Sequence, residues 1–303
     1  MRLLLLLSLL LLAPSIAAAQ SSASVSKSHR SSLALKVGVA VSMTGASAAA
    51  PMSANAASTS SFALKMAGLQ RSQDVEIAKI GRVRIAVARP TGRGPFPSII
   101  ILHGSHGFAS EYVELARHFA DGGILAVAAC WFSGGSEPGR RFIRPLECPQ
   151  GTPSIPLADS DQAYAIIDSL VAAVRALPES RDDQIALFGH SRGGGAVRSY
   201  LLRGGRVQAG IMNSAGYPDS SDLSKLSASV LILHGTADRP ADGGSAFTNV
   251  SKARAFEAQL RANHKPVEAH YYRGGTHNGL FSDRLQRRDE VRRILEFLHG
   301  HFR

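Results

Sequence analysis

The sequence has few aromatic residues and few of the features that bind cofactors or membranes. Aromatic side chains make up 6% of its 303 residues, and Trp131 is the single tryptophan. Nothing in this composition indicates an aromatic platform for stacking sugars or nucleic-acid bases. The sequence has neither a P-loop nor a dinucleotide-binding fingerprint, and no histidine, cysteine and carboxylate cluster has the spacing of metal ligands. We therefore expect no cofactor and no bound metal.

Long apolar runs are also missing. The longest, Leu3–Leu12, is about half of the ~20 residues that a membrane-spanning helix needs, so we expect no stable membrane insertion. It follows Arg2 and precedes the small residues Ala17–Ala19, which is the pattern of a cleavable export signal. We predict a signal peptide over residues 1–19 and a protein exported to the periplasm or secreted. Lys27–Ala50 has a similar basic and then apolar pattern, which leaves the true start site open.

The charge pattern argues against a nucleic-acid partner. A formal net charge of +11 is typical of proteins that bind polyanions. The basic residues are scattered, however, and the densest group alternates with acidic and apolar residues, as on a solvated helix face. That group consists of Arg284, Arg287, Arg288, Arg292 and Arg293.

The rest of the chain divides into a linker and one folded domain. Residues 20–70 are rich in serine and alanine without periodicity, which predicts a mostly disordered linker. Residues 71–303 alternate apolar runs with helical patterns, which predicts an α/β fold with a mostly parallel central sheet and helices on both faces. The predicted strands are Val75–Ile80, Val83–Ala88, Ser98–Leu102, Ile124–Ala129, Ile185–Phe188, Ala209–Met212, Val230–Leu233 and Val267–Tyr272. The predicted helices are Tyr112–Ala120, Asp159–Leu177, Gly194–Leu202, Ser251–Asn263 and Asp283–His299.

A G-x-S-x-G motif, Gly189–Gly193, stands between a predicted buried strand and a predicted helix. This context is typical of a nucleophile elbow, in which the glycines leave room for a tight turn that exposes the serine hydroxyl. We predict that Ser191 is a nucleophile. A serine hydroxyl needs a base within hydrogen-bonding distance.

His277 is the best candidate for that base. It lies in a glycine-rich loop after the last predicted strand, and such loops form the active edge of open α/β sheets. Neutral His277 acting as a base predicts that activity rises with pH near neutrality. His190 sits inside the elbow and is expected to point away from a substrate. His103 and His234 end strands and are interpreted as structural hydrogen-bonding residues.

Asp238 is the preferred third member, because it follows the strand Val230–Leu233 and reaches the same edge. Asp219, Asp222 and Asp242 remain alternatives. For the oxyanion of the reaction, the backbone N–H of Arg192 is one candidate donor. The N–H of Ser105, in the loop after Ser98–Leu102, is the other.

Four motifs together carry a family resemblance: HGSHG from His103, GHSRGG from Gly189, HGTAD from His234 and GGTHNG from Gly274. From Val75 to its C-terminus the chain resembles the α/β-hydrolase superfamily, in particular its dienelactone-hydrolase-like branch. The resemblance implies an α/β-hydrolase fold and hydrolysis of small-molecule esters or lactones. Dienelactone hydrolases proper use a cysteine nucleophile where this chain has Ser191, which favours a general carboxylesterase.

Two other functions stay open. One is a serine peptidase or amidase similar to prolyl oligopeptidases, whose usual propeller domain is absent here. The other is a binding protein that kept the fold without catalysis. The sequence does not indicate an oligomeric state. Because Cys130 and Cys148 are the two cysteines of a chain predicted to be exported, they predict one disulfide.

Overall fold

The computed structural model describes residues 75–134 and 142–302. The predicted signal peptide and the predicted linker lie outside these residues. An antiparallel hairpin of β1 (Val75–Ile80) and β2 (Val83–Ala88) begins the sheet. Its turn places Gly81 at a φ of 57°, a backbone conformation that glycine adopts without steric cost. Both strands have the predicted bounds.

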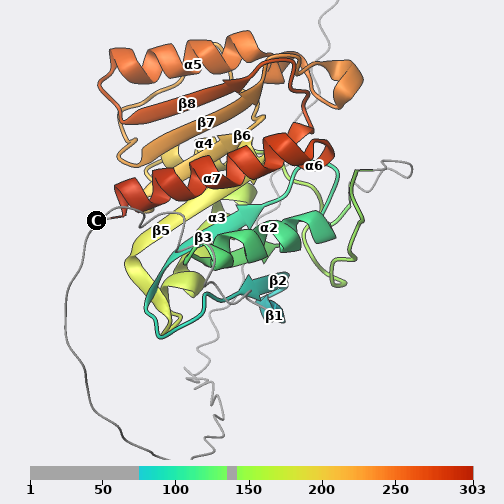
Figure 1. Cartoon of the computed structure of the whole chain (residues 1–303), viewed down its shortest axis with the longest axis vertical. Coiled ribbons are helices and arrows are strands. Elements are labelled where there is room, and N and C mark those ends of the chain that lie inside the picture. The colour runs from blue at the N-terminus through green and yellow to red at the C-terminus, as the bar shows by residue number, and fades with distance from the viewer. Residues whose placement is uncertain (1–74, 135–141, 303) are drawn as a thin grey trace, which may run out of the picture. The chain divides into compact units, whose positions relative to one another are not determined.

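The described strands form one sheet in the order β1-β2-β4-β3-β5-β6-β7-β8 (Figure 1). β2 pairs antiparallel with β4, and every neighbouring pair from β4 to β8 is parallel. The mostly parallel sheet predicted from the sequence is therefore confirmed. The strands after the hairpin are β3 (Phe96–Leu102), β4 (Leu125–Ala129), β5 (Ser180–His190), β6 (Ala209–Asn213), β7 (Ser229–Gly235) and β8 (Val267–Tyr272).

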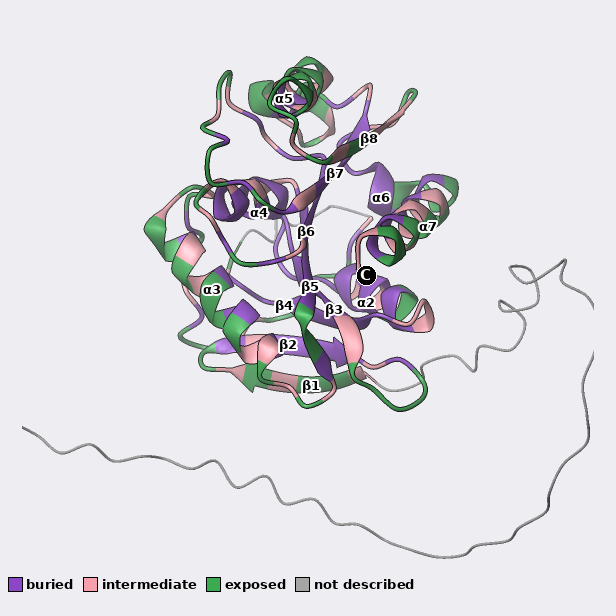
Figure 2. Ribbon diagram, turned by 90° about the vertical axis from the view of Figure 1, so that its left-hand side faces the viewer, coloured by how far each residue is buried: buried purple, intermediate pink, exposed green. Residues whose placement is uncertain are grey.

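Helices cover both faces of the sheet, as Figure 2 shows with the sheet seen edge-on. One face carries α3 (Asp161–Arg175), α4 (Arg192–Leu202) and α5 (Val250–Ala262). The other face carries α2 (Ser110–Asp121), α6 (Gly279–Ser282) and α7 (Arg284–His301). Two short 3₁₀ helices, η1 (Pro240–Asp242) and η2 (Ala246–Thr248), lie between β7 and α5.

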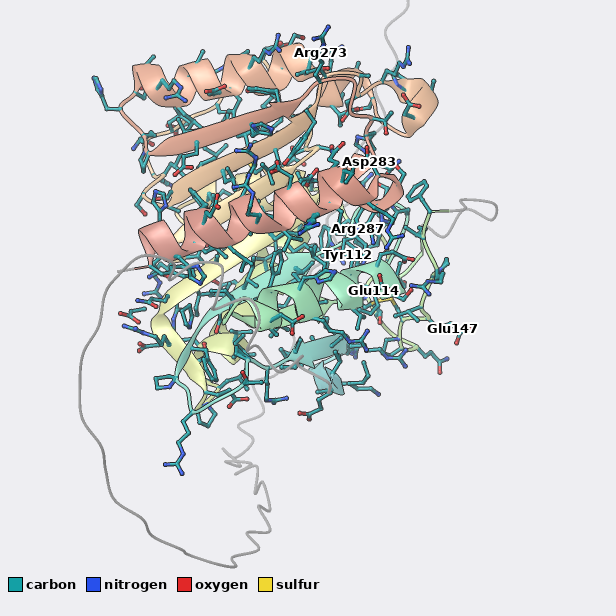
Figure 3. The ribbon with its side chains drawn as sticks, in the orientation of Figure 1. Tyr112, Glu114, Glu147, Arg273, Asp283 and Arg287 are labelled. Carbon is teal, nitrogen blue, oxygen red and sulfur yellow. A yellow bond between two sulfur atoms is a disulfide. The ribbon has the colours of Figure 1, made fainter. Side chains whose placement is uncertain are left out.

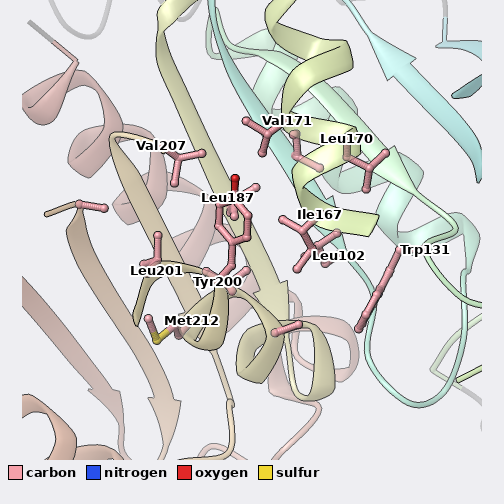
Figure 4. Packing of buried hydrophobic residues seen from close by; sticks show 14 of the residues in the cluster. Leu102, Trp131, Ile167, Leu170, Val171, Leu187, Tyr200, Leu201, Val207 and Met212 are labelled. Carbon is pink, nitrogen blue, oxygen red and sulfur yellow. The ribbon is translucent and has the colours of Figure 1, made fainter. Parts of the chain in front are cut away.

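Each face has its own apolar core. On the first face, Leu187 of the central strand β5 belongs to one buried cluster with Ile167 of α3 and Leu201 of α4 (Figure 4). On the second face, Phe188 packs against Phe119 of α2, with ring centroids 6.3 Å apart. Successive residues of β5 thus point to opposite faces, as the strand period requires.

α2 and α7 also lie side by side on the second face. An ion pair of 3.9 Å joins Arg287 of α7 to Glu114 of α2, and both residues are labelled in Figure 3. The amphipathic helix predicted from the arginine-rich sequence is α7, whose buried residues include Ile294, Phe297 and Leu298. The densest group of arginines is therefore part of a helix surface, as the charge pattern indicated.

The largest boundary difference concerns β5, which begins at Ser180 rather than at Ile185. Phe96 pairs with Ser180, the register then shifts, and Ser98 pairs with Ile185. The intervening residues include Arg181, Asp182 and Asp183, which are exposed, so the apolar pattern could not reveal this first part of the strand. α3 begins two residues later than expected, because the Ser160 hydroxyl caps it by accepting a hydrogen bond of 3.2 Å from the Ala163 N–H.

Candidate active site

Ser191 lies at the sharp turn between β5 and α4, where its φ and ψ are 52° and −114°. The turn has no room for side chains at its glycines. A Cβ at Gly189 would lie 2.2 Å from the Gly193 carbonyl carbon, and a Cβ at Gly193 would lie 2.3 Å from the Leu102 carbonyl oxygen. The Ser191 N–H donates a hydrogen bond of 2.9 Å to the Asn213 carbonyl, which holds the turn against β6. The predicted tight elbow is therefore present.

His277 lies within hydrogen-bonding distance of Ser191. The Ser191 hydroxyl is 2.9 Å from Nε2 of His277, and Nδ1 of His277 is 2.8 Å from Oδ2 of Asp238. His277 and Asp238 are buried, whereas Ser191 is partly exposed. The structure thus brings together the three residues that sequence analysis placed after β5, β7 and β8.

The Asp238 carboxylate has three side-chain donors. Besides His277, Oδ2 lies 3.3 Å from Nε2 of His234, and Oδ1 accepts a hydrogen bond of 2.8 Å from the Thr248 hydroxyl. Burial alone would raise the pKa of Asp238, but the hydrogen bonds from His234 and His277 outweigh burial and lower that pKa to about 2. Asp238 is therefore ionised at neutral pH and able to stabilise a protonated His277.

The alternative aspartates are engaged elsewhere. Asp219 is exposed and forms an ion pair with Lys252. The Asp222 carboxylate accepts a hydrogen bond of 2.9 Å from the Ser224 N–H. Asp242 forms an ion pair of 3.2 Å with Arg239. None of these three carboxylates contacts His277 in the described part of the chain.

The loop that contains Ser105 packs directly against the nucleophile turn. A Cβ at Gly104 would lie 3.2 Å from the Ser191 Cβ, a tight contact, so glycine favours this close approach of the loop. The Gly104 N–H is occupied, because it donates to the Tyr112 hydroxyl at 2.9 Å. The N–H groups of Ser105 and Arg192 make no hydrogen bond with any described residue. They are the available donors beside Ser191.

The Arg192 side chain bridges two segments next to Ser191. Its Nε donates to the Ser105 hydroxyl at 3.0 Å, and its Nη1 donates to the Pro156 carbonyl at 2.8 Å. The guanidinium therefore joins the loop after β3 to the irregular segment before α3. Sequence analysis assigned a role only to the backbone of Arg192, so this bridging role of the side chain was missed.

His103, His190 and His234 are buried and have structural hydrogen bonds, as expected. His103 has Nδ1 3.0 Å from the Gly104 carbonyl, and burial lowers the pKa of His103 to about 4. His190 is fully buried, contacts Asn213 and Asn278, and makes no hydrogen bond with Ser191. His234 donates from Nε2 to the Thr248 carbonyl at 2.6 Å. Sequence reasoning missed Thr248, because a threonine ten residues after Asp238 carries no recognisable signal.

A disulfide joins Cys130 and Cys148, whose Cα atoms are 6.0 Å apart. Cys130 directly follows β4, and Cys148 belongs to the irregular segment that returns to α3. The segment also contacts α2, because the Arg144 N–H donates to the Glu111 carboxylate at 2.9 Å. The predicted pairing of the two cysteines is thus present in the structure.

The described residues show neither a metal-binding cluster nor a membrane-spanning helix. Within 75–134 and 142–302, no group of three or more histidine, cysteine, aspartate or glutamate side chains is arranged to hold a metal ion. No helix in this part of the chain is long and apolar enough to cross a membrane.

Comparison with known families decides the classification. The model of the dienelactone hydrolase family matches residues 83–293, which include every strand from β2 to β8 and the whole site around Ser191. The chain belongs to the dienelactone hydrolase family. Membership of this family supports ester hydrolysis as the activity of the protein. No curated protein sequence matches this member of the family.

Solved structures share the fold of this dienelactone hydrolase family member at low sequence identity. The dienelactone hydrolase-like promiscuous phosphotriesterase P91, from metagenomic libraries, is 16% identical with a TM-score of 0.59, over 75% of this chain and 97% of that one. A thermophilic esterase from Thermogutta terrifontis with butyrate bound is 15% identical with a TM-score of 0.56, over 76% and 95%. The same esterase phosphorylated by paraoxon is 16% identical with a TM-score of 0.55, over 75% and 94%. These likenesses confirm the α/β-hydrolase fold.

Proposed function

We propose that this protein hydrolyses carboxylic esters or lactones of small molecules through an acyl-enzyme on Ser191. The observation that carries the proposal is the hydrogen-bonded series Ser191–His277–Asp238, with 2.9 Å and 2.8 Å between successive polar atoms. A serine hydroxyl is a poor nucleophile until a base takes its proton as it attacks. The partly exposed Ser191 and the buried His277 and Asp238 fit these three roles.

In the first half of the reaction, the Ser191 oxygen attacks the ester carbonyl carbon while its proton moves to Nε2 of His277. The ionised Asp238 holds Nδ1–H of His277 and stabilises the imidazolium. The imidazolium then gives its proton to the departing alcohol oxygen as the ester bond breaks. In the second half, His277 takes a proton from water, the hydroxide attacks the acyl-enzyme, and Ser191 recovers its proton.

The carbonyl oxygen becomes negatively charged in both halves and needs fixed donors. The N–H groups of Ser105 and Arg192, which make no hydrogen bond with a described residue, are proposed to fill this role. Losing one such donor typically lowers the rate by ~10²–10³. Because Arg192 begins α4, its N–H also lies at the positive end of the helix dipole.

The substrate class is proposed from the family and its neighbours. The family model is named for lactone hydrolysis, and the Thermogutta terrifontis esterase holds butyrate, a short acyl product. Both favour small acyl groups. Since one fold serves many substrates, amide and peptide hydrolysis are treated as outcomes of the same experiment.

The proposal is tested with p-nitrophenyl esters of increasing acyl length and with aminoacyl-proline amides. We expect hydrolysis of short esters, loss of activity in Ser191→Ala, and unchanged activity in Ser169→Ala, which alters an exposed serine of α3. A fluorophosphonate probe should label Ser191 alone. Full activity in Ser191→Ala, or labelling of another serine, contradicts the mechanism. Faster cleavage of amides than of esters would change the proposed substrate class from esters to amides.

We also propose that the protein is exported and works in the periplasm or outside the cell. The signal-like sequence at residues 1–19 supports this location, although it lies outside the described residues. The Cys130–Cys148 disulfide supports it independently, because such bonds persist in oxidising compartments.

A further inference from the structure

A carboxyl group, Glu290 of α7, is completely buried behind the site. Oε1 of Glu290 accepts a hydrogen bond of 2.8 Å from the Gln286 amide, and Oε2 accepts one of 2.5 Å from Nδ2 of Asn213. No lysine, arginine or histidine within the described ranges forms an ion pair with it. A carboxylate buried without a cationic partner carries a large desolvation penalty, which a proton removes.

Glu290 is connected to the loop of His277 through three side chains. The Asn213 amide that contacts Glu290 also lies 2.6 Å from Nδ1 of His190. Nε2 of His190 lies 3.3 Å from Oδ1 of Asn278, the residue that follows His277. The rings of His190 and His277 are 5.2 Å apart, centroid to centroid. α7, β6, the nucleophile turn and the histidine loop therefore meet in one polar chain.

One end of this chain is fixed. The Asn278 amide nitrogen donates to the Asp242 carbonyl at 2.8 Å, so the atom of Asn278 that faces His190 is an oxygen, which only accepts hydrogen bonds. Burial lowers the pKa of His190 to about 3, so its ring is neutral and carries one N–H. The position of that hydrogen depends on how the Asn213 amide is oriented.

If Glu290 is ionised, it accepts a hydrogen bond from the Asn213 amide nitrogen. The Asn213 oxygen then faces His190 and accepts its Nδ1–H. Nε2 of His190 is left with a lone pair opposite the Asn278 oxygen. Two acceptors then face each other across 3.3 Å, and the connection to the histidine loop is lost.

If Glu290 is protonated, the same positions give an unbroken chain. Glu290 donates to the Asn213 oxygen, and the turned Asn213 amide donates to Nδ1 of His190. The His190 hydrogen is then on Nε2 and is donated to Asn278. Each link from Glu290 to Asn278 then joins a donor to an acceptor, so the protonated form satisfies this chain and the ionised form does not.

The charges around Glu290 also favour its proton. Burial and, to a lesser extent, the negative charge of Asp289 on the same helix raise the pKa of Glu290 to about 8, although the hydrogen bond from Gln286 lowers it. From β8, Tyr272 faces the pair and donates to Asp289 at 3.0 Å. From α2, Glu114 and His118 interact with Arg287 instead. α6 has no titratable side chain.

We propose that protonated Glu290 is a positioning residue, which acts through Asn213 and His190 on Asn278 and so holds the loop of His277 in its reactive place. The proposal rests on the proposed function of His277. At alkaline pH, Glu290 loses its proton to solvent, the Asn213 amide turns over, and the His190 hydrogen moves by exchange from Nε2 to Nδ1. The loop of His277 then loses one hydrogen bond.

The first test is the pH dependence of kcat for p-nitrophenyl acetate, corrected for spontaneous hydrolysis. We expect the wild-type rate to fall about fivefold as pH rises through 8, the effect of one typical hydrogen bond. Glu290→Gln, which keeps a donor facing Asn213, should lack this fall. Glu290→Leu, which has no donor, should show the reduced rate at every pH.

Glu296→Gln is the matched control on the same helix, because Glu296 is exposed and pairs with Arg292. It should keep the wild-type alkaline fall. If Glu290→Gln falls with pH as the wild type does, the assignment to Glu290 is wrong. Circular dichroism of each variant establishes that it has folded.

The second test is independent of activity. In wild-type protein with ¹⁵N-labelled histidine, long-range ¹H–¹⁵N spectra report which ring nitrogen of His190 carries hydrogen, and a His190→Gln sample identifies the signals. We expect Nε2–H at pH 6.5 and Nδ1–H at pH 9.5. An unchanged tautomer overturns the positioning chain even if the enzyme is active. A tautomer change without any ester hydrolysis would instead refute the proposed function alone.

Discussion

The Thr248 hydroxyl donates a hydrogen bond of 2.8 Å to Oδ1 of Asp238, the carboxylate oxygen that does not face His277. The same hydroxyl oxygen accepts a hydrogen bond of 2.8 Å from the Ser245 N–H, as part of the cap of η2. A short 3₁₀ helix therefore fixes the orientation of the acid. Gly244 lies directly against this carboxylate, so a larger residue would clash with it: a Cβ at Gly244 would lie 2.2 Å from Oδ1 of Asp238.

Thr248→Val should lower kcat for short esters by about tenfold, because valine has the same shape but lacks the donor to a charged carboxylate. KM should change little, since Thr248 is buried and does not reach the substrate side of Ser191. Thr248→Ser keeps a hydroxyl and should restore most of kcat. Steady-state kinetics of the two variants checks this, and equal loss in both would show that only packing matters.

Asp238→Asn should lower kcat by as much as ~10⁴, because an amide no longer holds the required His277 tautomer or stabilises its positive charge. Asp219→Asn and Asp222→Asn are matched controls and should keep wild-type activity, since both carboxylates bind elsewhere at the surface. Initial rates with p-nitrophenyl acetate distinguish the three variants. A large loss in either control would reassign the acid.

The stability of the protein should fall as pH rises from about 6.5 to about 8, the range above the ordinary pKa of histidine, where the buried and neutral His103 and His190 no longer add stability with rising pH. Glu290 has a pKa of about 8 in the folded protein and 4.5 as its ordinary value, so the folded state holds the proton more tightly throughout this window. Unfolding then releases a proton, and higher pH favours it, by an amount on the order of a few kcal/mol. Urea unfolding at pH 7 and pH 8.5 measures this decrease.

Glu290→Gln should weaken that pH dependence, because a glutamine cannot take part in the proton release. Glu296→Gln should keep it, since its side chain is about half exposed. The same slope in wild type and Glu290→Gln would show that another group carries the effect.

The purified protein should contain no free thiol. Mass spectrometry after denaturation with an alkylating reagent, without reduction, should find the peptides of Cys130 and Cys148 linked. Removing the bridge through Cys130→Ser with Cys148→Ser should lower the free energy of unfolding by ~3 kcal/mol in the chain-entropy view. Two alkylated cysteines in the unreduced protein would refute the bridge.

The mature protein should begin near Gln20. N-terminal sequencing of the active protein from periplasm or medium checks the predicted cleavage after Ala19. Recovery of the active form from the cytoplasm with Met1 intact would contradict both the cleavage and the proposed location.

Most of the fold could be predicted, because the patterns that mark its strands and helices lie within short stretches of the sequence. Buried strands such as Val230–Leu233 are short apolar runs, and their carboxyl ends lie at one edge of the sheet by topology alone. Ser191 and Asp238 each follow such a run, and His277 follows β8, a strand that is only partly buried. Their proximity could therefore be predicted without any distance.

The parts that sequence reasoning missed depend on contacts between distant segments. Glu290 has the sequence context of an exposed charge within an arginine-rich helix, yet it faces Asn213 and is completely buried. The Arg192 guanidinium meets Pro156 only because the irregular segment returns to the site. No local pattern encodes either contact. The exposed beginning of β5 was also missed, since pairing with Phe96 defines it while its side chains remain polar.

The close contact of Gly193 with the Leu102 carbonyl has a consequence for the newly made chain. The strained φ of Ser191 is held from outside the elbow, because the end of β3 lies against Gly193 and the Asn213 carbonyl of β6 accepts a hydrogen bond from the Ser191 N–H. A precursor that has not folded therefore has an ordinary, unreactive serine at position 191.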